Sequence, residues 1–380
     1  GDAVSSASTG NEVIIDAGTV RIVYGGNSDS SATGNIVNIN GGSISGYVAG
    51  GETISGYATS NVVNINAGTV QDVYGGMANG DCYGSAENNY VTWRDGAIKG
   101  NVYGSVIENR STYTPVKNNG GTFNVYKNID GSSKELAEGK LGGFDYMKFY
   151  RENGEKLDTP IVTAKEVILA DTPKFGLAVS NGTALTNGAK ISLLKAEEGL
   201  TGTFTPENNY YINTFDIEKF FGFEEGYMLI YASEISSIQS ENNVLSITYQ
   251  EDSSINRIVF GSPDGAGYGR VMETGDEIFA GIKASDQKLN LKKNSFNFYT
   301  AVGGFGIGLE DVTGNTVIID GTTIGKENGP KSISIAEVAS RTFYNGDVYG
   351  GLQFQEKGNI NNNTVIITDS KIRGSVYGGK

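Results

Sequence analysis

The side chains that carry out most enzyme chemistry are scarce in this 380-residue chain. It contains no histidine, which excludes Ser-His-Asp and Cys-His catalysis and also histidine ligation of zinc. Cys82 is the only cysteine, so no disulfide can form within the chain. Carboxylate pairs, or a Ser or Lys nucleophile, therefore remain the catalytic options.

The carboxylates do not recur in a pattern that suits catalysis. Pectate lyases and polygalacturonases, which are parallel β-helices, place several acidic residues on one outer face of adjacent coils. Here the acidic residues fall at different positions of the repeat described below, as at Glu12, Asp16, Asp72 and Asp95. Residues 303–308 read Gly-Gly-Phe-Gly-Ile-Gly and lack the Asp that a calcium-binding β-roll repeats. We therefore predict no enzyme activity, no metal site and no cofactor.

The charge of the chain limits its partners. The formal net charge is -14 and the pI is near 4.6, so phosphate backbones and anionic lipid headgroups are repelled, and nucleic acid is not an expected partner. No run of about 18 apolar residues is present, so we expect no membrane insertion by this chain.

One phrase recurs along the chain: an Asn that opens a short apolar alternation, a Gly corner, a second apolar strand and a close like Val-Tyr-Gly-Gly. Self-similarity at such a period is typical of stacked architectures, in which one unit cannot bury its apolar face alone. The predicted fold is all-β, a right-handed parallel β-helix (β-solenoid) interrupted by a mostly β inserted region. The copies run over residues 11–26, 35–51, 61–76, 89–105 and 363–379, and a sixth, split copy runs over 315–351.

The alternation predicts which side chains point into the solenoid. We expect the apolar pair of each first strand inside, such as Val37 and Ile39 in the second copy. The leading Asn suits a left-handed corner and can form a ladder of amides from coil to coil. This ladder is predicted for Asn11, Asn35, Asn61, Asn89, Asn315 and Asn363.

The closing Tyr lies next to an inward Val and is therefore expected to point outward. Two interpretations stay open: the rings stabilise a Gly-rich edge by contacting one another, or they form an exposed platform for a sugar or a partner protein. Ala49 replaces the Tyr in the second copy, which weakens a continuous platform. The column comprises Tyr24, Tyr74 and Tyr103, followed by Tyr349 and Tyr377.

Loops of unequal length connect each close to the next Asn, over residues 27–34, 52–60 and 77–88. In a solenoid these loops emerge at one corner, and loops on a rigid scaffold commonly carry binding residues. The competing interpretation is that they are solvated connectors. The contact candidates are Tyr57, Asp81, Cys82, Tyr83 and Glu87.

The phrase divides the chain into three parts. Residues 1–125 and 311–380 are predicted coils, and residues 126–310 are either an irregular all-β insertion or a degenerate stretch of solenoid, since both alternate. Short helices are conceivable over 130–140, 213–221 and 275–284. Strands are predicted over 165–170, 190–195, 227–231, 244–249 and 255–260.

These residues resemble a known family. The tandem Asn-x-Val-x-Ile … Val-Tyr-Gly-Gly coils are similar to the passenger domains of autotransporters, the type V secreted surface proteins of Gram-negative bacteria. Residues 185–204, LTNGAKISLLKAEEGLTGTF, and the later Tyr-Met-Leu-Ile … Asn-Val-Leu-Ser-Ile-Thr-Tyr resemble stretches common in such passengers. The coil resemblance covers about the first 125 and the last 65 residues.

The family implies a β-helical stalk outside the outer membrane, attached through a region not in this chain, with adhesion as its usual activity. We therefore expect an extracellular surface adhesin, present here as a piece of a longer protein. Its partner would be a host-cell or bacterial glycan or protein, bound by the corner loops or the inserted region. The first alternative is a passive spacer that presents a distal binding tip, and the second is a β-helical polysaccharide lyase or hydrolase.

Overall fold

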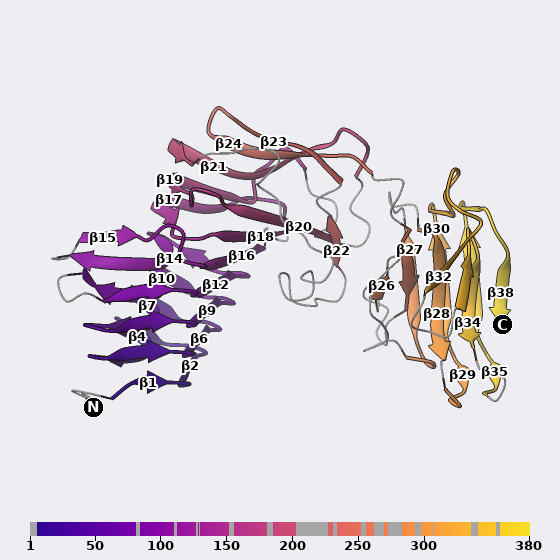
Figure 1. The fold of residues 1–380 in the computed structure, drawn as a ribbon, viewed down its shortest axis with the longest axis horizontal. Coiled ribbons are helices and arrows are strands. Elements are labelled where there is room, and N and C mark those ends of the chain that lie inside the picture. The colour runs from indigo at the N-terminus through magenta and orange to yellow at the C-terminus, as the bar shows by residue number, and fades with distance from the viewer. Residues whose placement is uncertain are drawn as a thin grey trace.

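A computed structural model shows the chain as a β-solenoid of about ten coils with parallel sheets, which confirms the predicted fold class. Figure 1 shows two stacks of strands, with the N-terminus at the outer end of the first and the C-terminus at the outer end of the second. The structure describes residues 6–80, 84–109, 112–126, 128, 130–151, 156–180, 185–202, 227–230, 234–251, 256–261, 270–272, 283–292, 298–306, 308–335, 341–354 and 358–380.

Three sheets form the first stack. The corner sheet contains β1 (Ser8–Thr9), β5 (Ser31–Thr33), β8 (Tyr57–Thr59) and β11 (Ser85–Glu87). The eight-stranded sheet contains β2 (Glu12–Ile15), β6 (Ile36–Ile39), β9 (Val62–Ile65), β12 (Tyr90–Trp93), β16 (Thr122–Tyr126), β18 (Tyr146–Arg151), β20 (Lys174–Ser180) and β22 (Tyr227–Ile230). The twelve-stranded sheet contains β3 (Thr19–Val20), β4 (Val23–Ser28), β7 (Ser43–Thr53), β10 (Thr69–Asn79), β13 (Ala97–Ile98), β14 (Val102–Asn109), β15 (Thr112–Pro115), β17 (Lys134–Gly142), β19 (Val162–Ile168), β21 (Lys190–Thr201), β23 (Ile235–Glu241) and β24 (Val244–Tyr249).

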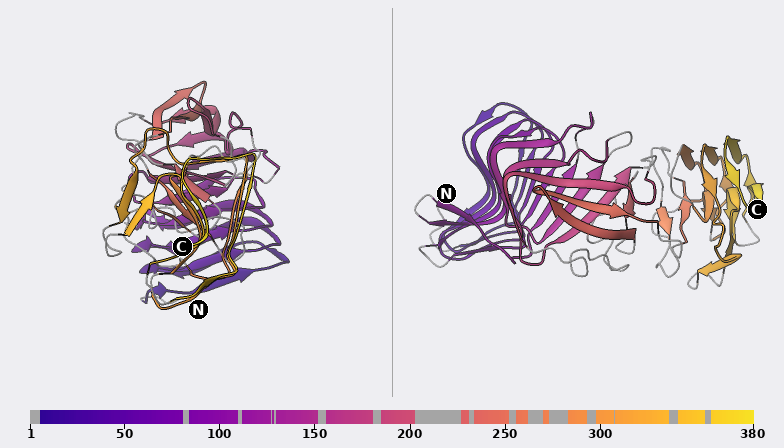
Figure 2. Two further views of the ribbon diagram at one scale, coloured as in Figure 1. Left: turned by 90° about the vertical axis from the view of Figure 1, so that its right-hand side faces the viewer. Right: turned by 90° about the horizontal axis from the view of Figure 1, so that it is seen from above.

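The second stack repeats the arrangement with shorter sheets. Its strands are β25 (Ile258–Phe260), β26 (Arg270–Met272), β27 (Lys288–Lys292), β28 (Thr300–Gly306), β29 (Val312–Thr313), β30 (Thr316–Asp320), β31 (Thr323–Ile324), β34 (Val348–Gln353), β35 (Ile360–Asn361), β36 (Thr364–Thr368), β37 (Lys371–Ile372) and β38 (Val376–Gly379). The insertion in the split repeat forms a hairpin of β32 (Ser332–Ile335) and β33 (Arg341–Tyr344). Seen along its stacking direction in the left panel of Figure 2, the second stack shows coils that superimpose. In the right panel the coils of the first stack appear as nested curves, each displaced from the one before.

Antiparallel strands cover the inner end of each stack. β22 pairs with β20, β24 pairs with β21, and β23 pairs with β24, all antiparallel. In the second stack β26 pairs antiparallel with β25. A buried ion pair links the two regions, because Arg257, next to β25, lies 2.5 Å from the carboxylate of Glu234, next to β23.

The core follows the predicted alternation. Val37, Ile39, Val63 and Ile65 are fully buried in one contiguous apolar cluster that continues into the second stack. Ile367 in the outermost coil is 38% exposed, because its strand β36 has a neighbour on one side only.

The predicted amide ladder is present in both stacks. The side chain of Asn35 donates to Asn61 Oδ1 at 3.0 Å, and Asn61 donates to Asn89 Oδ1 at 3.1 Å. Asn315 donates in the same way to Asn363 Oδ1 at 2.8 Å. The glycine pair of each close makes room for this ladder, since a Cβ on its second glycine would meet the next Asn. The fourth copy has no such Asn after it, and there the hydroxyl of Ser105 accepts from Asn89 instead.

The middle block contains further coils of the first stack. β17, β19 and β21 extend the parallel ladder of the twelve-stranded sheet, so residues 134–201 continue the solenoid. The helix considered for residues 130–140 is wrong, because Lys134–Gly142 is strand β17, which pairs with coils on both sides. The helix considered at 213–221 lies outside the described residues, and so does the helix considered at 275–284 apart from residues 283 and 284, which are not helical.

Candidate functional site

The closing phrases bring tyrosines together on the outer face of the twelve-stranded sheet. Tyr24 pairs with Ala49, Ala49 with Tyr74, and Tyr74 with Tyr103, so the first three tyrosines of the predicted column lie in one continuous row across four strands; Tyr349 and Tyr377 pair with each other in the second stack. These rings belong to an apolar cluster separate from the main core, which agrees with their predicted outward direction.

Tyr74 and Tyr103 nevertheless do not form an exposed platform. They are only 2% and 3% exposed. Their rings lie 5.9 Å apart and are stacked, and Met77 and Val106 pack beside them. Of the two interpretations of the column, the structure supports mutual stabilisation at this position.

Tyr47 fills the gap that Ala49 leaves in the row. β7 contains one extra residue relative to β10, and this shift brings Tyr47 opposite Asp72 and beside the row. Its ring centroid lies 5.6 Å from that of Tyr24 and 5.5 Å from that of Tyr74. The sequence signal for this contact was the spacing from Ile44 to Val48, which is one residue longer than that from Val70 to Val73, and sequence reasoning missed it.

Tyr113 comes from outside the repeat. Its strand β15 folds back antiparallel on β14, and its ring stacks on Tyr74 with centroids 5.4 Å apart. This hairpin interrupts the coil, so periodicity gave no reason to place Tyr113 beside Tyr74.

Carboxylates surround these rings. Asn27 donates to Glu52 at 2.8 Å, and Tyr24 contacts both the hydroxyl of Tyr47 and the carboxylate of Glu52. Burial raises the pKa of Glu52, while its hydrogen bond with Tyr24 opposes the shift. Burial likewise raises the pKa of Tyr103 to about 12, with the charges of Glu166 and Asp72 adding to the effect. We call the half-buried set Tyr24, Tyr47, Glu52, Glu108 and Tyr113 the tyrosine–carboxylate surface; Tyr74 and Tyr103 lie beneath it.

Two of the loop candidates lie on the corner sheet. Tyr57 is 59% exposed and stands between Ser31 and Ser85 of the adjacent strands. Glu87 is exposed beside Thr59. Neither belongs to the tyrosine cluster, so the structure does not gather all the predicted residues into one site. Asp81, Cys82 and Tyr83 lie outside the described residues.

The tyrosine–carboxylate surface suits binding to a hydroxyl-rich ligand. Tyrosine offers an apolar face and a polar hydroxyl, and carboxylates accept hydrogen bonds from hydroxyl groups. Over the part of the chain that the structure describes, no three acidic or cysteine side chains are grouped so that they could hold a metal ion. In the same part of the chain no helix is long and apolar enough to span a membrane.

Comparison with known proteins adds no relative to this picture. No protein family, no curated protein and no solved structure matches the chain.

Proposed function

We propose that this chain is part of a bacterial surface adhesin and that it binds a neutral glycan on the tyrosine–carboxylate surface. The observation that carries the proposal is the arrangement of Tyr24, Tyr47 and Tyr113 with Glu52 and Glu108 on one face. The half-buried rings are already held in place by their contacts with neighbouring tyrosines, so they lose little conformational entropy when a ligand binds.

The charge of the protein selects among glycans. With a net charge of -14 and carboxylates in the surface itself, an acidic polysaccharide would be repelled. A neutral sugar chain can lie on the rings and donate hydrogen bonds from its hydroxyl groups to Glu52 and Glu108. The extracellular location in this proposal comes from the resemblance to autotransporter passengers.

The test is binding of the full chain to an array of neutral and acidic cell-surface glycans. We expect binding to neutral glycans that falls when Tyr47→Ala and Tyr113→Ala are combined. The matched control is Tyr57→Ala, which removes an exposed ring from the corner sheet. If the double variant binds as the original chain does, or if only Tyr57→Ala weakens binding, the proposed surface is wrong.

A passive spacer is the second candidate, and the buried amide ladder favours it. Asn35, Asn61 and Asn89 join successive coils by side-chain hydrogen bonds in addition to the parallel strands, which suits a rod that bears load. This candidate predicts that the chain binds no glycan and no cell type specifically. It also predicts that a longer protein keeps its affinity for its target after whole coils are removed.

A further inference from the structure

Lys134 occupies a position that belongs to the apolar core. It is the first residue of β17 and pairs with Val162, which in turn pairs with Leu194, and both are fully buried. Lys134 itself is only 1% exposed. Lysine is almost never buried to this degree without a partner for its charge.

The partner of this ammonium is an amide. Lys134 Nζ lies 2.8 Å from Asn128 Oδ1 and 5.2 Å from the centre of the Trp93 ring. Within the described ranges no carboxylate forms an ion pair with Lys134. The nitrogen is therefore held against the carbonyl of Asn128 in a largely apolar environment.

The amide of Asn128 is fixed from its other side. Its Nδ2 donates to Ser132 Oγ and to the carbonyl of Ser133, each at 3.0 Å. Ser132 Oγ in turn donates to Asp130 at 2.6 Å. A turn closed by the Gly131 N–H and the Asn128 carbonyl at 2.9 Å holds these groups in one loop.

We propose that Lys134 and Asn128 join in an isopeptide bond. The neutral Nζ attacks Cγ of Asn128 and forms the new Nζ–Cγ bond while the electron pair of the C=O moves to Oδ1. As the carbonyl re-forms, the Cγ–Nδ2 bond breaks, and Nδ2 takes the proton that Nζ loses and leaves as ammonia. An amine and a primary amide thus become a secondary amide and ammonia, without any oxidant or reductant.

The geometry and the environment favour this reaction. Because a C=O bond is about 1.2 Å long, a nitrogen at hydrogen-bond distance from Oδ1 lies within about 4 Å of Cγ, and such proximity greatly accelerates an intramolecular step. Burial lowers the pKa of Lys134 to about 8, against the opposing charges of Asp95 and Asp130, so part of the amine is neutral near physiological pH. Ser132, held by Asp130, touches the leaving nitrogen and offers a route for its proton.

The first experiment is the intact mass of the purified full chain, followed by tryptic peptide mapping. We expect a mass lower than the sequence mass by one ammonia. Trypsin should fail to cleave after Lys134, and the peptide covering residues 128–140 should carry the loss. A folded chain that retains its full mass and is cleaved normally after Lys134 overturns the proposal.

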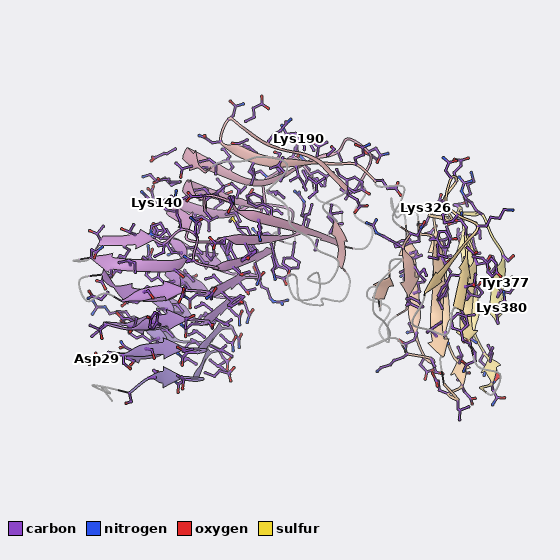
Figure 3. All side chains as sticks on the ribbon, viewed as in Figure 1. Asp29, Lys140, Lys190, Lys326, Tyr377 and Lys380 are labelled. Carbon is purple, nitrogen blue, oxygen red and sulfur yellow. The ribbon has the colours of Figure 1, made fainter. Side chains whose placement is uncertain are left out.

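Variants distinguish the isopeptide bond from other reactions that also release ammonia, such as cyclisation of an Asn onto its own backbone. Lys134→Met and Asn128→Ala should each restore the full mass of the peptide. Lys140→Met, a change on the same strand at a half-buried lysine labelled in Figure 3, should leave the loss unchanged. Ser132→Ala should slow formation of the bond and alter its pH profile. Persistence of the loss in Lys134→Met would overturn the proposal.

Discussion

Gly51 and the side chain of Asn61 compete for one space: an ideal Cβ on Gly51 would lie 2.5 Å from Asn61 Nδ2. Asn61 is fully buried there and accepts from both the backbone and the side chain of Asn35 at 3.0 Å. The glycine pair and the Asn of the next coil are therefore one structural unit spread over two repeats.

Asn61→Ala should strongly destabilise the first stack. The change leaves the buried N–H of Asn35 without an acceptor and removes the donors to Ala32 and Asn89, so we expect a loss of about 2 to 4 kcal/mol in the free energy of unfolding. Urea unfolding followed by circular dichroism measures it. The control is Asn64→Ala, whose amide is half-buried on the outer face and should cost about 0.5 kcal/mol or less. Equal losses in both variants would contradict a special role of the buried ladder.

Alanine should be tolerated at one closing glycine and not at another. A Cβ on Gly50 would clash with the carbonyl oxygen of Gly75, which is backbone and cannot move cheaply, so Gly50→Ala should cost on the order of 1 to 3 kcal/mol. The equivalent Gly378 has only the carbonyl of Asn363 within reach, at 3.7 Å. Gly378→Ala should therefore leave the thermal midpoint nearly unchanged. If both variants lower the thermal midpoint by a similar amount, the clash with the next coil is not the reason for glycine at position 50.

The Glu234–Arg257 ion pair should matter far more than exposed pairs. Both side chains are buried, so Arg257→Met removes the guanidinium that lies against the Glu234 carboxylate in the interior and should cost about 3 to 5 kcal/mol. Lys165→Met removes a lysine that contacts Glu138 and Glu198 at the surface and should cost less than about 1 kcal/mol. The two variants can be compared by urea unfolding. A small effect of Arg257→Met would show that the pair does not join β23 to β25 energetically.

Glu52 should make stability depend on pH. Burial raises the pKa of Glu52 in the folded chain. The contribution of Glu52 to the free energy of unfolding is therefore fully present below the pKa of the unfolded chain, about 4.5, and is lost as pH rises through the pKa of the folded chain. Glu52→Gln removes this dependence, so the variant should gain stability relative to the original chain between about pH 4 and pH 7. Denaturation midpoints at both pH values provide the measurement. A variant that loses relative stability over this interval would show that the carboxylate is favourably charged in the fold.

Tyr113→Ala should weaken glycan binding more than it weakens the fold. Its ring is half-buried on the tyrosine–carboxylate surface, and loss of one aromatic contact of about 1.4 kcal/mol corresponds to a tenfold weaker affinity. Calorimetric titration with the best glycan of the array measures the change. Tyr113→Phe keeps the ring and should retain most of the affinity, so a similar loss in both variants would assign the effect to the hydroxyl instead.

The sequence by itself determined the solenoid, its core and its ladder. Every coil has the same neighbours above and below, so equivalent positions require the same residue types. The repeat therefore conserves the leading Asn, the alternating Val and Ile, and the closing glycines. Ser105 stands where the other copies have the second closing glycine. No ladder Asn follows it, so its side chain has room and accepts a hydrogen bond from Asn89.

Only the tertiary structure decided which residues form the candidate surface and whether the middle block continues the solenoid. Tyr47 reaches the tyrosine row through one extra residue in β7, and Tyr113 through a hairpin outside the repeat; neither follows from a period. Residues 134–140 have a local sequence compatible with a helix, yet pairing with coils on both sides imposes a strand. The contact between Lys134 and Asn128 depends in the same way on a loop that folds back onto the solenoid, because burial and proximity across a turn arise only when the chain is packed.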